Sequence, residues 1–97
     1  MSLELTFHGH SAFILSDGET TVAVDPFFTG NPAATIKASQ VSCTHVALTH
    51  GHEDHFGDTI EIAKKNNATV VAAYEIVNYV AEQGHEKGEP GNPGGCI

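Results

Sequence analysis

The sequence of 97 residues suits one domain, and its 40% hydrophobic content is typical of a globular chain rather than a disordered one. Its 12 acidic residues outnumber 4 basic ones, and the net charge of −8 argues against nucleic acid or an anionic membrane as a partner. Two cysteines, no long apolar run and no signal-peptide pattern predict a cytoplasmic protein without a disulfide framework.

The first quarter of the chain predicts a three-stranded antiparallel meander. Residues 3–7 alternate apolar and polar side chains, which suits a strand with one buried face. Two further β-rich runs, 12–16 and 20–24, lie on either side of Asp17-Gly18, a strong signal for a hairpin turn.

A long loop is predicted next, from residue 26 to residue 44. This segment contains two prolines and a glycine (Pro26, Pro32 and Gly30) and has no clean period, although a helical turn is expected near residues 33–38. A loop of this length in a small domain is usually functional or covered by other elements.

The middle of the chain predicts a strand–helix–strand unit. Apolar runs at residues 45–49 and 69–72 suit buried strands. The helix between them begins at Asp58, with Glu61 three residues later in the pattern of a capping box, and ends at Asn66-Asn67. Such a crossover requires parallel strands.

A second amphipathic helix is predicted from residue 74 to residue 83, with Gly84 as the residue that ends it. The remaining residues, 85–97, include four glycines and two prolines and show no periodicity. We therefore divide the chain into a domain of residues 1–84 and a Gly/Pro-rich irregular tail of residues 85–97. The fold class is α/β (α+β), a meander followed by β-α-β-α.

Residues 50–55 carry the densest chemistry in the chain. Three histidines and an aspartate form the pattern H-x-H-x-D-H. Imidazole nitrogen and carboxylate oxygen are ligands of borderline divalent metals such as zinc and manganese. The pattern lies between a predicted strand end and a helix start, where ligands tend to bind in α/β proteins. It therefore predicts a metal site; the alternative is a solvated polar loop.

The spacing of the motif suits two adjacent metal ions. His50 and His52 can point the same way on an extended backbone, while Asp54 and His55 turn toward a second position. Two metals would lower the pKa of a bound water, hold the resulting hydroxide between them and polarise a carbonyl or phosphoryl oxygen. Asp54 would then be both a ligand and the catalytic residue that orients the hydroxide.

Residues 49–55 resemble the signature of the metallo-β-lactamase-fold hydrolases. Three further stretches, 7–13, 24–32 and 57–63, are similar to a narrower group of bacterial metal-dependent hydrolases related to the lactonase that acts on phosphorylated ascorbate. The resemblance covers residues 3–84 in sequential order. It implies the N-terminal half of an αββα sandwich with a metal site at the sheet edges.

The resemblance also implies roles for individual residues. The four ligands would bind two ions in pairs, His50 with His52 and Asp54 with His55. Asp25 would support the histidine loop without binding metal. His10 matches a histidine near the mouth of the site, although a hydrogen-bonded turn histidine is an equal alternative. The other histidines that we expect to be structural or solvated are His8, His45 and His85.

Members of the family are roughly twice as long as this chain. The resemblance places a further histidine, a bridging aspartate and a last histidine in their second half, whereas this sequence supplies only two side-chain ligands per proposed metal. A catalytic zinc usually has three protein ligands. Without the second sheet of the sandwich, the first sheet would have an uncovered apolar face.

The leading hypothesis is a metal-dependent hydrolase of an ester, lactone or phosphoester in a small-molecule substrate. Its cofactor would be zinc or manganese, up to two ions, and its site would be completed by a homodimer, another homo-oligomer or a complementary chain fragment. The alternative is a non-catalytic metal-binding or interaction module, or a truncated fragment of the same fold. A third hypothesis, an RNA-processing nuclease, conflicts with the charge of −8.

Overall fold

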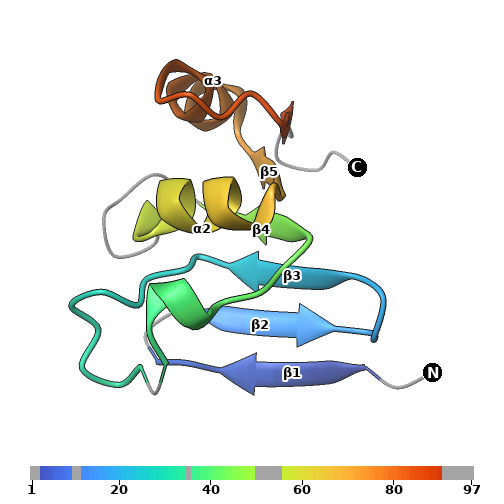
Figure 1. The fold of residues 1–97 in the computed structure, drawn as a ribbon, viewed down its shortest axis with the longest axis vertical. Coiled ribbons are helices and arrows are strands. Elements are labelled where there is room, and N and C mark those ends of the chain that lie inside the picture. Colours follow the sequence, from blue (N-terminus) through green and yellow to red (C-terminus); the bar gives the residue numbers. More distant parts are fainter. Residues whose placement is uncertain (1–2, 10–11, 35, 50–55, 91–97) are drawn as a thin grey trace.

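The computed structural model describes residues 3–9, 12–34, 36–49 and 56–90. Its strands form one six-stranded mixed sheet in the order β1-β2-β3-β4-β5-β6 (Figure 1). The elements in chain order are β1 (Glu4–Phe7), β2 (Phe13–Ser16), β3 (Thr21–Val24), the 3₁₀ helix η1 (Ala38–Gln40), β4 (His45–Ala47), α2 (Thr59–Asn66), β5 (Thr69–Ala72), α3 (Tyr74–Glu82) and β6 (Gly88–Pro90).

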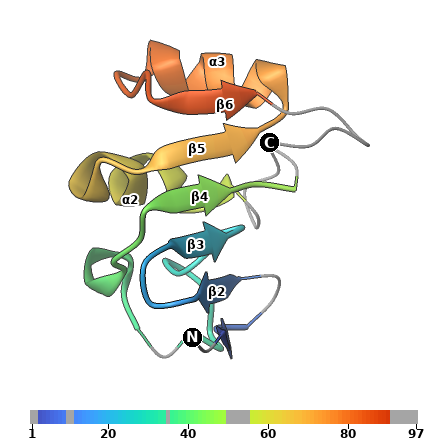
Figure 2. The ribbon, with the colours of Figure 1, turned by 90° about the vertical axis from the view of Figure 1, so that its right-hand side faces the viewer.

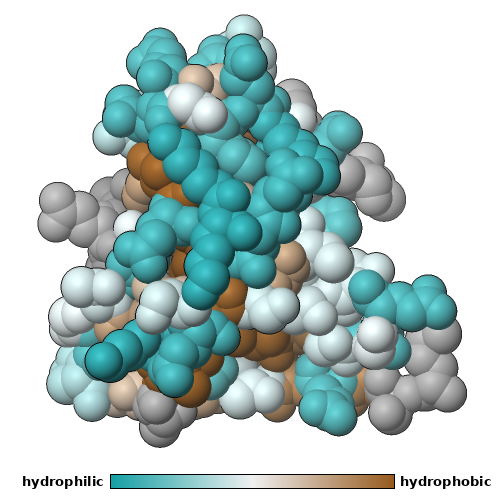
Figure 3. All heavy atoms as spheres, in the orientation of Figure 1, coloured by the Kyte–Doolittle hydropathy of each residue, from teal (hydrophilic) through white to brown (hydrophobic). Residues whose placement is uncertain are grey.

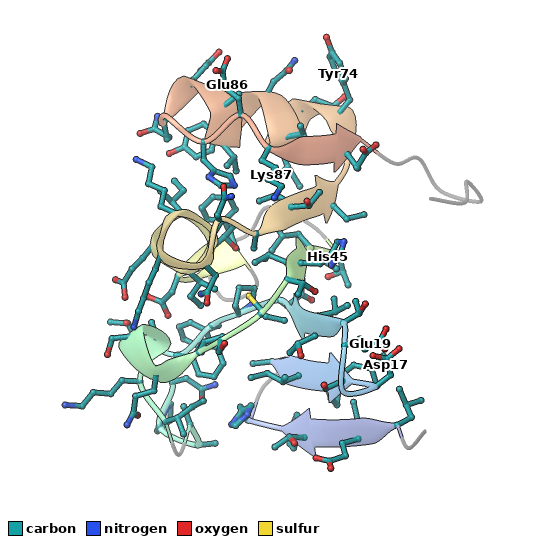
Figure 4. All side chains as sticks on the ribbon, turned by 45° about the vertical axis from the view of Figure 1, so that its right-hand side comes forward. Asp17, Glu19, His45, Tyr74, Glu86 and Lys87 are labelled. Atoms are coloured by element: carbon teal, nitrogen blue, oxygen red, sulfur yellow. The ribbon has the colours of Figure 1, made fainter. Side chains whose placement is uncertain are left out.

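The antiparallel meander is confirmed in β1, β2 and β3. A four-residue turn joins β2 to β3, because Ser16 pairs directly with Thr21. The Asp17 carboxylate closes this turn by accepting the backbone N–H groups of Glu19 at 2.9 Å and Thr20 at 2.8 Å. Asp17 and Glu19 lie together at the turn in Figure 4. Gly18 has a φ of +97°, which only glycine adopts readily.

The strand–helix–strand unit is also confirmed. β3, β4 and β5 are parallel neighbours, and α2 connects β4 to β5. The helix ends where the sequence predicts, because Asn67 adopts the left-handed conformation with φ +49°. The helical turn expected near residues 33–38 lies slightly later, at η1.

The last strand corrects the prediction of an irregular tail after residue 84. β6 pairs in parallel with β5, with Val70 opposite Gly88. A Cβ atom at Gly88 would lie 2.7 Å from Cγ1 of Val77, so only glycine lets this strand pass so close to α3. Pro90 is tolerated because an edge strand has an unpaired side. His85 leads into β6 and is buried, with Nε2 2.7 Å from the carbonyl oxygen of Ala68.

Both α-helices that the structure describes, α2 and α3, lie on the same face of the sheet (Figure 2). α2 packs on β4, and α3 packs on β5 and β6. The buried core lies between these helices and the strand residues that point toward them. Its members include Ala23, Val46, Val70 and Ala72 from the strands and Ile62, Ala63 and Val80 from the helices. We call this side of the sheet the covered face. Within the described part of the chain, no helix is long and apolar enough to cross a bilayer.

The opposite side of the sheet, which we call the open face, is apolar but only partly buried. Leu5 and Phe7 of β1 are 64% and 59% exposed. Next to them on β2, Leu15 and Phe13 are half-buried, and the rings of Phe7 and Phe13 lie 5.0 Å apart. The apolar pattern continues through β3 with half-buried Val22 and Val24, whereas β4 and β5 place polar His45 and Thr69 on this face beside Ala47 and Val71. The uncovered apolar face implied by the resemblance is therefore present in the residues that the structure describes.

Candidate functional site

The residues predicted to bind metal are outside the described residues. These are His50, His52, Asp54 and His55, together with His10 near the expected mouth of the site. Their roles therefore stay predictions. Among the residues that are described, no three His, Cys, Asp or Glu side chains converge as a metal-binding group would. The structure does describe both segments that lead into and out of the motif.

The motif begins at the carboxyl end of β4, the strand between the parallel neighbours β3 and β5. It ends before Phe56, shortly ahead of α2. This is the edge of a parallel sheet where ligands tend to bind in α/β proteins. The position that the sequence predicts, between a strand end and a helix start, is therefore confirmed for the flanking elements.

Asp25 holds the residue that directly precedes the motif. Its carboxylate accepts the backbone N–H of Thr49 at 2.7 Å and the hydroxyl of Thr49 at 2.6 Å. The Asp25 N–H donates to the carbonyl oxygen of Ala47 at 2.9 Å, and the side chain is only 2% exposed. These hydrogen bonds fix the end of β4 against the end of β3.

The backbone of Asp25 is itself unusual. Its φ is +45°, a left-handed conformation that aspartate tolerates better than most non-glycine residues. The turn after it is closed by the N–H of Phe27, which donates to the carbonyl oxygen of Asp25 at 2.7 Å. The chain therefore turns sharply at Asp25 while the carboxylate stays aimed at Thr49.

Asp58 ties the other end of the motif to the same loop. Its carboxylate accepts the N–H groups of Phe28 at 2.9 Å and Thr29 at 2.8 Å, and its own N–H donates to Pro26. The predicted capping box is therefore wrong, because the Asp58 side chain makes no cap on α2. The carboxylate instead bonds Phe28 and Thr29, which lie far from Asp58 in the sequence. A local sequence pattern cannot indicate such a contact.

Gly57 allows this close approach. Its φ is +46°, and a Cβ atom there would lie 2.6 Å from both the Cα of Phe27 and the carbonyl oxygen of Pro26. A larger residue would push the exit of the motif away from the loop that follows β3. Both ends of the motif are therefore anchored to residues 25–29.

The segment before His10 is held against the same loop. Asn31 donates from its side-chain amide to the carbonyl oxygens of Phe27 at 2.9 Å, Gly9 at 3.2 Å and His8 at 3.3 Å. The ring of His8 is buried 5.4 Å from the ring of Phe28. Its Nδ1 has no hydrogen-bond partner within the described structure. His8 is thus a core histidine, whereas His45 on β4 is half-buried and bonds the hydroxyl of Thr44 (Figure 4).

A cavity of about 710 Å³ opens beside the exit of the motif. Its walls come from the loop after β3, the segment before α2, and α3. The apolar lining residues are Phe27, Phe56, Ile76 and Tyr79, and the carboxylates are those of Asp58 and Glu75. The rings of Phe56 and Tyr79 meet edge to face, with centroids 5.8 Å apart. Sequence reasoning missed this cavity because three distant segments form it.

Comparison with known proteins identifies the family. A model described as a beta-lactamase superfamily domain matches residues 4–94. The chain belongs to this family. A UPF0173 metal-dependent hydrolase of Heliobacterium modesticaldum is 49% identical over 82 residues, covering 84% of this chain and 34% of that protein. Another, of Staphylococcus carnosus, is 49% identical over 94 residues, covering 96% of this chain and 41% of the relative.

Solved structures agree with this assignment. Igni18, a metallo hydrolase from the archaeon Ignicoccus hospitalis, matches with a TM-score of 0.81 and 31% identity over 93% of this chain and 40% of that one. A metal-dependent hydrolase structure from Parabacteroides distasonis matches with a TM-score of 0.66 and 20% identity, which shows the fold alone. The chain therefore has part of the metallo-β-lactamase fold, as predicted, and spans less than half the length of these relatives.

Proposed function

We propose that this chain supplies metal ligands to a metal-dependent hydrolase that cleaves an ester, lactone or phosphoester. The relatives named above are described as metal-dependent hydrolases, and residues 50–55 offer the imidazole and carboxylate donors that zinc or manganese takes. The observation that carries the proposal is the anchoring of both ends of the motif by Asp25 and Asp58. A loop fixed at both ends can hold closely spaced ligands in one arrangement.

In this proposal His50, His52, Asp54 and His55 bind up to two metal ions. A divalent metal lowers the pKa of a water ligand and polarises the substrate oxygen. Asp54 also orients the attacking water. Asp25 acts through Thr49 as a positioning residue, since it fixes the backbone immediately before His50.

We further propose that a second copy of this chain or a complementary chain completes the site. This chain carries two side-chain ligands per proposed metal, and a catalytic zinc usually has three. The open face also supports association, because large contiguous apolar patches on a soluble protein commonly mark an interaction surface. Leu5 and Phe7 provide its most exposed apolar side chains on β1.

The metal proposal is tested by measuring zinc and manganese binding with calorimetry. We expect His52→Ala to weaken binding by about a hundredfold or more, because even outer-shell partners are worth ~10–100-fold. The matched control is His45→Ala, which removes a histidine outside the motif that hydrogen-bonds Thr44. Equal losses in the two variants, or no metal binding by the unchanged chain, would contradict the proposal.

A second candidate function is a metal-binding module without turnover. Residues 50–55 supply imidazole and carboxylate donors that bind such metals whether or not a reaction follows. A panel of ester, lactone and phosphodiester substrates separates the two functions. Hydrolysis that His52→Ala abolishes supports the hydrolase, whereas tight metal binding without any hydrolysis supports the module.

A further inference from the structure

We infer that the cavity between the loop after β3, the start of α2 and α3 binds an ammonium group carried on an aromatic or alkyl body. Its volume of about 710 Å³ lies within the ~300–1,000 Å³ range of small-molecule sites. The residues that line the cavity all belong to the described part of the chain. None of them is a proposed metal ligand.

The walls provide aromatic surface. Phe27, Phe56 and Tyr79 come from three separate segments and line one cavity. The edge-to-face contact between Phe56 and Tyr79 orients both rings, and such contacts stabilise aromatic pairs beyond simple burial. Aromatic faces attract alkylammonium groups through their quadrupole while the ring surface accommodates the apolar substituents.

The charge of the cavity selects a cation. The carboxylates of Asp58 and Glu75 line it, and no Lys, Arg or His is among its described lining residues. The Asp58 carboxylate already accepts two backbone N–H groups, whereas Glu75 makes no ion pair or hydrogen bond with another described residue through its side chain. Glu75 is therefore the carboxylate that an incoming ammonium group would meet.

The position of the cavity connects it to the motif. Phe56 directly follows the motif in the chain, so one wall of the cavity continues from the proposed metal ligands. We assign the cavity to the organic part of the substrate, and this assignment rests on the proposed function. The binding of a cationic ligand does not rest on it.

The test is an NMR titration of the full chain with three probes of similar size: benzylammonium, benzyl alcohol and benzoate. We expect the cation to shift resonances of Phe56, Ile76 and Tyr79 with an affinity about tenfold higher than that of the alcohol, and benzoate to bind more weakly than either. Equal affinities for cation and alcohol, a preference for benzoate, or shifts confined to other surfaces would overturn the inference. A titration repeated with a chelator present separates this result from metal binding. Removal of the metal leaves the residues that line the cavity unchanged.

Two variants sharpen the test. Glu75→Gln should remove the preference for the cation and leave alcohol binding unchanged, whereas Tyr79→Leu should weaken both because it removes a ring and keeps an apolar wall. Glu82→Gln is the matched control, since it removes the same charge from the same helix at a residue that does not line the cavity. An equal effect of Glu82→Gln and Glu75→Gln would contradict the role of Glu75.

Discussion

The two faces of the sheet differ in what lies over them rather than in the apolar character of their strands. On the covered face, α2 and α3 bury Val46 and Val70 almost completely. On the open face, Phe7 and Leu5 remain more than half exposed although they alternate along β1 as buried strand residues do. In the orientation of Figure 3, hydrophilic residues spread over the α3 end of the molecule, and hydrophobic ones show in patches between them. Among the residues that the structure describes, helices therefore cover the apolar side chains of one face and leave those of β1 on the other face exposed.

The largest expected effect is on the covered face. Ile62 of α2 has no exposed surface and belongs to the core. Ile62→Ala should lower the free energy of unfolding by about 2–5 kcal/mol, because it removes buried methylene groups and leaves a cavity. Urea denaturation measures this loss.

The matched change on the open face is Leu5→Ala. Because Leu5 is 64% exposed, its truncation in the dissociated chain should cost no more than about 0.5 kcal/mol. A loss as large as that of Ile62→Ala under dissociating conditions would show that the two faces do not differ as described.

The next prediction concerns Asp25, at the edge of the sheet that leads into the motif. Asp25→Ala removes two hydrogen bonds to Thr49 and should lower the free energy of unfolding by about 1–3 kcal/mol. It should also weaken metal binding about 10–100-fold if Asp25 positions the motif. The metal readout distinguishes positioning from stability, since a purely structural role would change the unfolding midpoint and leave the affinity of the folded chain unchanged.

Association tests the open face directly. Leu5→Lys places a charge among apolar side chains and should weaken self-association about tenfold or more, because burial of a leucine is worth ~1.5–3 kcal/mol. Thr6→Lys is the control, since neighbouring residues of a strand point to opposite faces. Sedimentation velocity compares the two variants. Equal dissociation constants would argue that the open face is not the contact surface.

The smallest effect is at the turn between β2 and β3. The N–H groups of Thr20 and Glu19 hold the pKa of Asp17 below its ordinary value of 3.8. A carboxylate with a lowered folded-state pKa stabilises the fold above its unfolded pKa, and this contribution disappears as the pH falls through the folded value. The difference in thermal midpoint between the unchanged chain and Asp17→Asn should therefore be small at neutral pH and shrink below pH 3.8. A difference that grows on acidification would contradict this assignment.

Short sequence patterns were sufficient to predict those elements of the fold whose formation depends on neighbouring residues. Alternation predicted β1, the Asp17-Gly18 signal predicted the hairpin, and the asparagine pair predicted the end of α2 at Asn67. The strand before the motif and the helix after it, β4 and α2, were predicted for the same reason. These features are encoded within a few consecutive residues.

Long-range contacts account for what the sequence did not reveal. β6 exists because Gly88 can approach Val77, which no periodicity in a Gly/Pro-rich segment indicates. Asp58 has the sequence signature of a helix cap but bonds Phe28, thirty positions earlier. The cavity beside Phe56 likewise depends on segments that meet only in the folded chain.

The most direct test of the account is native mass spectrometry of the full chain at micromolar concentration with zinc or manganese present. The account predicts assemblies of two or more chains that carry metal, and predicts that both His52→Ala and Leu5→Lys reduce the metal-loaded assembly. A chain that stays monomeric and metal-free under these conditions would contradict the proposal that the anchored motif binds metal and that the open face supports association.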